Sequence, residues 1–291
     1  MQYLRFKPSE RLLFFIITLV VCALIGTIFV GFIVHNGITT KSLRLATVIQ
    51  DCVIFILPAV LTAVIISALP ARFLRIDSVF SARQLILAIV AMLVSIPLMN
   101  WIVMMNDSLV LPESLSGLEE WMRSHEEEAR NSVKILLGGD SIGSLVIDLL
   151  IVGVLAGLSE EILFRGALQQ LFYSSGMNRH LAIWLTAVIF SAIHMQFFGF
   201  VPRLLLGAYF GYLLWWSNSL WLPAIIHALN NSIVVYSTWK YSLASQGGGD
   251  NPIDHWGLDS PMLIAASAIL TLFVVLRLKN TQIKSGLQSV K

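Results

Sequence analysis

The chain has 291 residues, of which 57% are hydrophobic and 12% are charged, and its mean hydropathy is +0.80. Soluble domains average about 45–50% apolar and about 25% charged residues, so this composition excludes an ordinary soluble protein and indicates a polytopic membrane protein. The formal net charge of +2 gives no indication of nucleic-acid binding.

The first apolar segment, Leu12–Val34, is 23 residues long and carries no charge. As a helix it measures about 34 Å, enough to cross a hydrocarbon core of about 30 Å. It is too long for the core of a signal peptide, so we expect it to remain as a span. Seven further apolar segments follow, namely Ala46–Leu69, Ala82–Met105, Ile142–Phe172, Leu181–Phe198, Leu204–Trp216, Leu220–Tyr236 and Pro261–Leu276. We therefore predict an all-α bundle of eight membrane spans with both termini on one side.

The distribution of Lys and Arg predicts the orientation of this bundle. Placing the N-terminus in the cytoplasm puts eleven of these residues on the cytoplasmic side and seven on the opposite side. Since positively charged loops are retained in the cytoplasm, we predict that both termini are cytoplasmic. No organelle-targeting segment is recognisable, which leads us to expect a multi-pass protein of a prokaryotic plasma (inner) membrane.

The longest polar loop, Asn106–Asp140, is acidic and falls outside on this topology. Within it Leu118, Trp121, Met122 and His125 share one helical stripe, which predicts an amphipathic helix on the surface. A solvated acidic face is the simplest interpretation of this loop, and a substrate gate is the alternative.

A second polar loop, Gln246–Asp259, contains three consecutive glycines and is expected to be flexible. We divide the chain into three parts. Residues 1–141 hold three spans and the acidic loop, 142–240 hold a core of four spans, and 241–291 hold the polar loop, the last span and a basic tail.

Three charged residues, Glu160, Glu161 and Arg165, lie inside the apolar segment Ile142–Phe172. A charge at mid-bilayer costs about 2.5–3.5 kcal/mol on insertion scales, so such residues indicate a functional site. Glu161 and Arg165 are four residues apart and can form an ion pair on one helix face. Glu160 points about 100° away and requires a different partner.

Candidate partners lie in later spans. Phe190 and His194 are four residues apart in one span, and His227 and Asn231 are four residues apart in another. A lone histidine in an apolar helix is usually a hydrogen-bonded core residue. Two such histidines, an asparagine and an unpaired glutamate in one bundle instead favour a site.

Two pairs of glycines point to close helix packing. Gly153 and Gly157 are one helical turn apart, as are Gly207 and Gly211. Small residues at this spacing let helix backbones approach closely in lipid. The first pair is expected to bring a neighbouring helix against the one that carries the charges.

These residue types suit hydrolysis of an amide inside the membrane. A carboxylate in a low-dielectric environment holds a proton more readily than in water, which suits a general base that activates a water molecule. Histidine and asparagine side chains can donate hydrogen bonds to the oxyanion that forms. Motifs of other protease classes are missing: the sequence contains no HExxH zinc motif and no GxGD motif, and Ser159 lacks the sequence of a nucleophile elbow.

The motifs Glu160-Glu161-xxx-Arg165, Phe190-xxx-His194 and His227-xxx-Asn231, in this order, resemble those of the CAAX protease and bacteriocin-processing family. This family is also called the type II CAAX prenyl endopeptidase or abortive-infection family, and its members are polytopic intramembrane proteases. The resemblance covers about Ile142–Tyr236. It implies a peptidase that acts on a protein or peptide substrate, either lipidated or embedded in the membrane.

The resemblance also implies roles for these residues. Glu160 and His194 would activate the attacking water, and His227 and Asn231 would orient it or stabilise the oxyanion. Glu161 and Arg165, supported by Phe190, would maintain the architecture of the site.

The metal requirement of such a site is open. We favour a mechanism without a cofactor, although Glu160, His194 and His227 are also compatible with a zinc ion that keeps an open fourth position. Two classes of non-protease remain as alternatives: a transporter with a Glu/Arg/His relay, and a non-catalytic membrane protein of the immunity type.

One expectation conflicts with this hypothesis. Counting along the predicted spans places Glu160 and His227 near the inner third of the bilayer and His194 near the outer third. An earlier start of the fourth span, or discontinuous or tilted helices that line a cavity, would bring them together. Asp51 and Asp148 lie near span ends, where we expect them to reach the membrane interface.

Overall fold

The computed structural model describes residues 6–35, 37–245, 253 and 255–282. These residues form helices and turns and contain no strand, which confirms the all-α class. The helical elements are α1 (Pro8–Val34), α2 (Thr40–Ile49), η1 (Gln50–Ile56), α3 (Leu57–Ile66), α4 (Pro70–Phe73), α5 (Ala82–Val94), α6 (Ile96–Asp107), η2 (Glu113–Leu115), α7 (Ser116–Leu136), α8 (Ile142–Asp148), η3 (Leu149–Ala156), α9 (Gly157–Glu161), η4 (Ile162–Leu168), α10 (Gln169–Ser174), α11 (Arg179–Ala192), η5 (Phe197–Gly199), α12 (Phe200–Ser217), α13 (Trp221–Ser245) and α14 (Pro261–Lys279). Eight of the 14 residues of the loop Gln246–Asp259, including its three consecutive glycines, lie outside the described residues, so its expected flexibility stays a prediction.

Every predicted span has a helical counterpart, but not all of these helices are long and apolar enough to cross a membrane. Among the described residues five are, and a sixth is added if α5 and α6, which are bent by 48°, count as one span. α11 is apolar but has only 14 residues. The structure thus supports a multi-pass membrane protein, and the number of eight spans and the orientation remain predictions.

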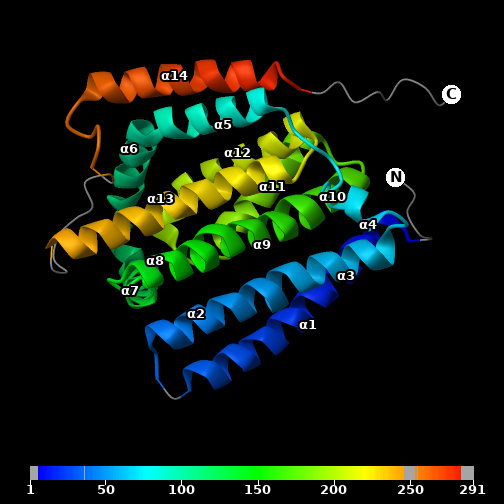
Figure 1. Cartoon of the computed structure of the whole chain (residues 1–291), viewed down its shortest axis with the longest axis horizontal. Helices are drawn as coiled ribbons and strands as arrows, with labels where there is room; N and C mark the ends of the chain where they lie inside the picture. The colour runs from blue at the N-terminus through cyan, green and yellow to red at the C-terminus, as the bar shows by residue number, and fades with distance from the viewer. Residues whose placement is uncertain (1–5, 36, 246–252, 254, 283–291) are drawn as a thin grey trace.

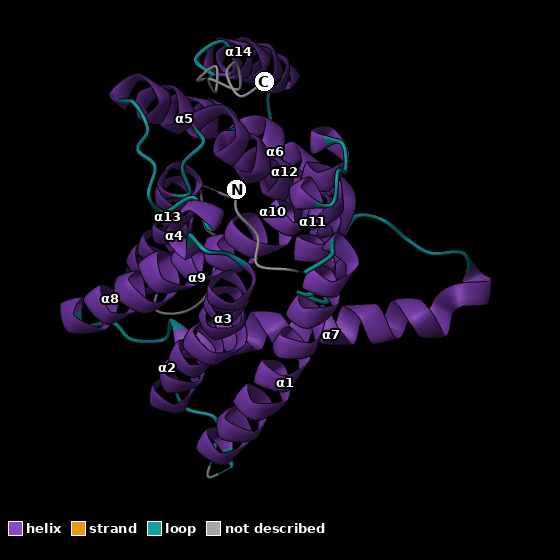
Figure 2. Ribbon diagram, turned by 90° about the vertical axis from the view of Figure 1, so that its right-hand side faces the viewer, coloured by secondary structure: helices purple, strands orange, loops and turns teal. Residues whose placement is uncertain are grey.

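The helices run roughly side by side (Figure 1). α1 begins and α14 ends at the same end of the bundle, on the right in Figure 1. α7 lies across the opposite end, where Figure 1 shows it along its axis and Figure 2 shows it lengthwise. The predicted amphipathic surface helix is therefore confirmed, and at 21 residues it fills much of the acidic loop.

The helix of residues 142–174 carries the charged residues and is not a regular α-helix. The α-helical turn α9 lies between two π-helical stretches, η3 and η4. A π-helix has a wider turn, which changes the direction in which successive side chains point, and π-helical turns occur frequently at functional sites.

The first glycine pair acts as predicted. A Cβ atom on Gly157 would lie 3.0 Å from the backbone nitrogen of Ala228, and one on Gly153 would lie 2.5 Å from the Ser232 hydroxyl. Both contacts belong to α13. The missing side chains therefore let α13 lie directly against the helix that carries Glu160.

The expectation that Asp148 reaches the membrane interface is wrong. Only 2% of Asp148 is exposed, and both of its carboxylate oxygens accept hydrogen bonds of 2.7 Å from Arg44 of α2. Arg44 also donates to the Ser144 hydroxyl. A partner 104 residues away in the sequence compensates this buried charge, and sequence spacing gives no indication of such a pair.

Candidate active site

The predicted ion pair between Glu161 and Arg165 is present and fully buried. Arg165 Nη1 lies 2.7 Å from Glu161 Oε1, and both side chains have an exposed fraction of 0%. Arg165 Nη2 donates a second hydrogen bond of 2.8 Å to the backbone oxygen of Gly207 in α12. The pair thus fixes the charged helix to α12.

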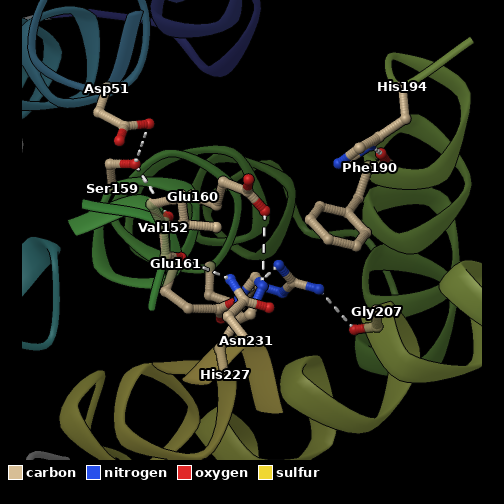
Figure 3. A network of polar contacts seen from close by, with 12 residues as sticks. Asp51, Val152, Ser159, Glu160, Glu161, Phe190, His194, Gly207, His227 and Asn231 are labelled. Carbon is tan, nitrogen blue, oxygen red and sulfur yellow. Dashed lines mark hydrogen bonds and ion pairs between the residues drawn. The ribbon is translucent and has the colours of Figure 1, made fainter. Parts of the chain in front are cut away.

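His227 lies between the two glutamates (Figure 3). Its Nδ1 is 2.9 Å from Glu161 Oε1, and its Nε2 is 3.6 Å from Glu160 Oε2. A carboxylate accepts hydrogen bonds when ionised, so Nδ1 carries a proton that it donates to Glu161. Nε2 consequently faces Glu160. Glu160, for which local spacing in the sequence indicated no partner, thus shares His227 with Glu161.

Aromatic rings hold these polar groups in place. The ring of Phe210 is stacked on His227 at a centroid distance of 4.6 Å and an angle of 22°. The ring of Phe190 lies 4.6 Å from the guanidinium carbon of Arg165 and 5.1 Å from the ring of His194. Phe190 therefore connects the ion pair to the second histidine.

His194 joins the other residues because α11 is short. We expected a span to Phe198, but the helix ends at Ala192, and Met195 adopts a left-handed backbone with φ of 53°. The chain then turns within the bundle and enters α12 at Phe200. This break after Ala192 is a discontinuous helix of the kind expected to bring His194 toward Glu160 and His227.

The orientation of His194 follows from one hydrogen bond. Its Nδ1 lies 2.7 Å from the backbone oxygen of Phe190, which can only accept, so Nδ1 carries the proton when the ring is neutral. Nε2 then has a free lone pair. Figure 3 shows the ring pointing from its turn toward the Glu160 carboxylate.

Asn231 lies one turn beyond His227 on α13. Its Nδ2 donates a hydrogen bond of 3.3 Å to the backbone oxygen of Val152 in the π-helical stretch η3. This bond uses one of the two amide hydrogens and leaves the side-chain oxygen and the other hydrogen for further partners.

Two residues that support the site were not identified from the sequence. Asp51 was expected at the interface, but only 1% of it is exposed, and its Oδ1 accepts a 3.0 Å hydrogen bond from Ser159, the residue before Glu160. Gln169, one turn beyond Arg165, donates a 3.2 Å hydrogen bond to the backbone oxygen of Gly211. A polar side chain in an apolar span was the only indication of either residue.

Two observations describe how the candidate zinc ligands are arranged. Within the described part of the chain no three His, Cys, Asp or Glu side chains form a group that could hold one. His227 uses Nδ1 for Glu161, and His194 uses Nδ1 for a backbone carbonyl. Both histidines thus direct Nε2 away from these partners. Because histidines that bind a metal commonly donate their other ring N–H in the same way, the mechanism without a metal stays a prediction.

Comparison with known families agrees with the motif order. Residues 142–233 match the family described as Rce1-like, type II CAAX prenyl endopeptidase. This segment is similar to a CAAX protease domain. The match covers less than half of the chain, and it contains all the motif residues described above. No curated protein and no solved structure matches the chain.

The family match confirms the resemblance deduced from the three motifs. Members of this family are endopeptidases, so the match supports a protease with a protein or peptide substrate, and the apolar helices support a location in the membrane. The match does not assign roles to individual side chains.

Proposed function

We propose that the protein is an intramembrane endopeptidase in which Glu160 activates water to hydrolyse a peptide bond. The observation that supports this most strongly is the placement of His227 between Glu161 and Glu160. Glu161, fixed by Arg165, holds the protonated Nδ1, and this leaves Nε2 directed at Glu160. The arrangement resembles the orientation of a catalytic histidine by a buried carboxylate.

In the proposed reaction a water molecule lies between Glu160 and the Nε2 atom of His194. Glu160 takes one proton from the water, and the hydroxide attacks the carbonyl carbon of the substrate. The carbonyl oxygen becomes an oxyanion, which hydrogen bonds from Asn231 and from protonated His227 stabilise. Glu160 then gives its proton to the leaving nitrogen as the carbon–nitrogen bond breaks. The reaction requires no cofactor.

The substrate is proposed to be a peptide or protein that carries a lipid near its cleavage site or is itself embedded in the membrane. The family name points to prenylated C-terminal segments. We also propose a prokaryotic plasma membrane as the location, on the basis of the sequence features given above.

The variant Glu160→Gln tests the proposal because it keeps the size of the side chain and removes the base. We expect a decrease in rate of about 10²–10⁴-fold, the usual contribution of a general base. The assay uses purified protein in detergent and an internally quenched peptide that ends in S-prenylated Cys-Ala-Ala-Met, with the product identified by mass spectrometry. Glu128→Gln, on the exposed surface of α7, is the matched control.

Unchanged cleavage by Glu160→Gln with a normal elution profile would contradict the proposal. The same assay separates the metal-free mechanism from the zinc version. We expect full activity in 1,10-phenanthroline and no zinc in the purified protein. Loss of activity that zinc restores would instead support the metalloprotease.

A further inference from the structure

Arg203 occupies a position that the proposed mechanism does not use. Arg165 donates to the backbone oxygen of Gly207, and Gln169, one turn later, donates to that of Gly211, one turn later on α12. The two helices therefore run side by side in a fixed register. One turn earlier in the same register, Arg203 comes to about the level of Glu161. It is therefore on the side of α12 that faces the candidate active site.

The contacts of Arg203 place its guanidinium at the turn that follows His194. Nη2 donates a hydrogen bond of 2.6 Å to the side-chain oxygen of Gln196, and Nη1 donates one of 3.4 Å to its backbone oxygen. The guanidinium also covers Gly199, where a Cβ atom would lie 3.1 Å from Nη2. Arg203 interacts electrostatically with Glu160.

The charge of Arg203 has no ion-pair partner in the described part of the chain. Arg165 and Arg44 each have a carboxylate at 2.7 Å, whereas no carboxylate of the described residues lies within 4.0 Å of the Arg203 guanidinium. A half-buried cation in a membrane protein is costly unless an anion compensates it. Both of its hydrogen bonds go to the neutral Gln196, and they leave part of its five-hydrogen donor fork for a ligand.

The surface helix α7 lies next to the turn that Arg203 contacts. Besides Glu160, the carboxylate that interacts electrostatically with Arg203 is Glu126 of α7, whose Oε2 is buried and has no hydrogen-bond partner among the described residues. α7 is held over the same turn, since Trp121 packs on Phe197 at 5.4 Å and Arg123 lies 4.2 Å above the ring of Phe198. The Arg203 guanidinium thus lies beside a turn that α7 covers.

We propose that Arg203 binds the C-terminal carboxylate of the peptide substrate and thereby selects peptides that are cut close to their end. This inference rests on the proposed peptidase function. A guanidinium binds a carboxylate through two parallel hydrogen bonds, a geometry that a lysine cannot reproduce. Arg203 lies at about the level of Glu161, close along the helix to Glu160, where the scissile bond is cut. The C-terminal carboxylate of the substrate can therefore reach Arg203 only if the fragment that leaves is short.

The test compares two internally quenched peptides ending in S-prenylated Cys-Ala-Ala-Met, one with a free C-terminal carboxylate and one with a C-terminal amide. The full-length protein is assayed in phosphatidylcholine vesicles. A hydrogen bond to a charged group is worth about 1.5–3 kcal/mol, so we expect kcat/KM to be about 10- to 150-fold higher for the acid. In Arg203→Gln the two peptides should be cleaved equally, because only the rate for the acid decreases. Arg203→Lys should recover a part of the preference.

Arg83→Gln, which changes an exposed arginine in the first turn of α5, should keep the full preference. An equal decrease for both peptides in Arg203→Gln would show a structural role and overturn the assignment. Active wild-type protein without any preference for the acid would also overturn it, and would leave the proposed peptidase function intact. Failure to cleave either peptide would count against the peptidase function itself.

Two further arms identify the source of the anion. An amide peptide with Glu in its last position should remain a poor substrate, and cleavage at the rate of the free acid would refute the assignment to the chain terminus. Added phosphatidylglycerol should leave the preference unchanged. If Arg203 held a lipid phosphate instead, Arg203→Gln would change the effect of phosphatidylglycerol on kcat/KM equally for the acid and the amide peptide. This result would show that the assignment is wrong.

Discussion

Replacing Arg165 by Met is the most direct test of the buried ion pair. The change removes the guanidinium that lies 2.7 Å from Glu161 and 2.8 Å from the Gly207 carbonyl, and it keeps an unbranched side chain of similar length. Glu161 then remains buried, with His227 as its only hydrogen-bond partner within the described residues. The position has an exposed fraction of 0%, so water cannot take the place of the guanidinium.

The magnitude follows from this geometry. Removing one partner of a buried ion pair costs about 3–5 kcal/mol, because an uncompensated charge is left behind. Removing both charges, as in Glu161→Gln with Arg165→Met, should cost less than Arg165→Met alone, since no unpaired charge then remains. The single variant should also lose peptidase activity, because Glu161 orients His227.

The measurement is the midpoint of thermal unfolding in detergent, followed by tryptophan fluorescence for the wild type, both single variants and the double variant. Arg83→Met, at an exposed position, is the matched control and should unfold like the wild type. A double variant that is less stable than Arg165→Met alone would refute the reasoning. An unfolding midpoint of Arg165→Met equal to that of the wild type would do so as well.

Two further predictions concern helix packing and the surface helix. Gly157→Ala should lower the free energy of unfolding by about 1–3 kcal/mol, because the added methyl comes within 3.0 Å of the backbone of α13. Gly31→Ala, where a Cβ atom would meet no neighbouring atom within 4 Å, is the control and should be neutral or stabilising by up to about 1 kcal/mol. An equal effect of both substitutions on the unfolding midpoint would contradict this prediction. The N–H of Leu111 and the side chain of Arg123 hold the pKa of Glu119 below its usual value of 4.5. A carboxyl group whose pKa is lower in the folded than in the unfolded state stabilises the fold at pH values above its unfolded pKa. This stabilisation is lost as the pH falls through the folded-state pKa, so proteolysis before α7 should increase below about pH 4.5. Glu119→Gln should lack this pH dependence, and a variant that retains it would disprove the assignment.

The sequence predicted those parts of the site that depend on local spacing. Glu161 and Arg165 are four residues apart on one helix, and they form the expected ion pair. Gly153 and Gly157 are likewise one turn apart, and α13 lies against them as predicted. In both cases the periodicity of a helix alone determines which side chains share a face.

The parts that could not be predicted depend on tertiary contacts or on irregular backbone. Asp51 and Ser159 are 108 residues apart and meet only because η1 packs against α9. The early end of α11 is equally invisible in the sequence, since Ile193 and Met195 continue the apolar pattern. A hydrogen bond from Ser191 to the backbone oxygen of Phe200 closes the turn, and this bond exists only after the chain has reversed.

The N-terminal spans are part of the scaffold of the site, although they lie outside the segment that matches the family. The match begins at residue 142. Asp51 nevertheless fixes Ser159, which is fully buried and directly precedes Glu160, and Arg44 neutralises Asp148 near the start of the same helix. The first contact gives one oxygen of the buried Asp51 carboxylate a hydrogen-bond donor, and the second neutralises the buried carboxylate of Asp148. The position of Glu160 is therefore determined by helices from both sides of the family boundary, and removal of the first three spans is expected to disturb it.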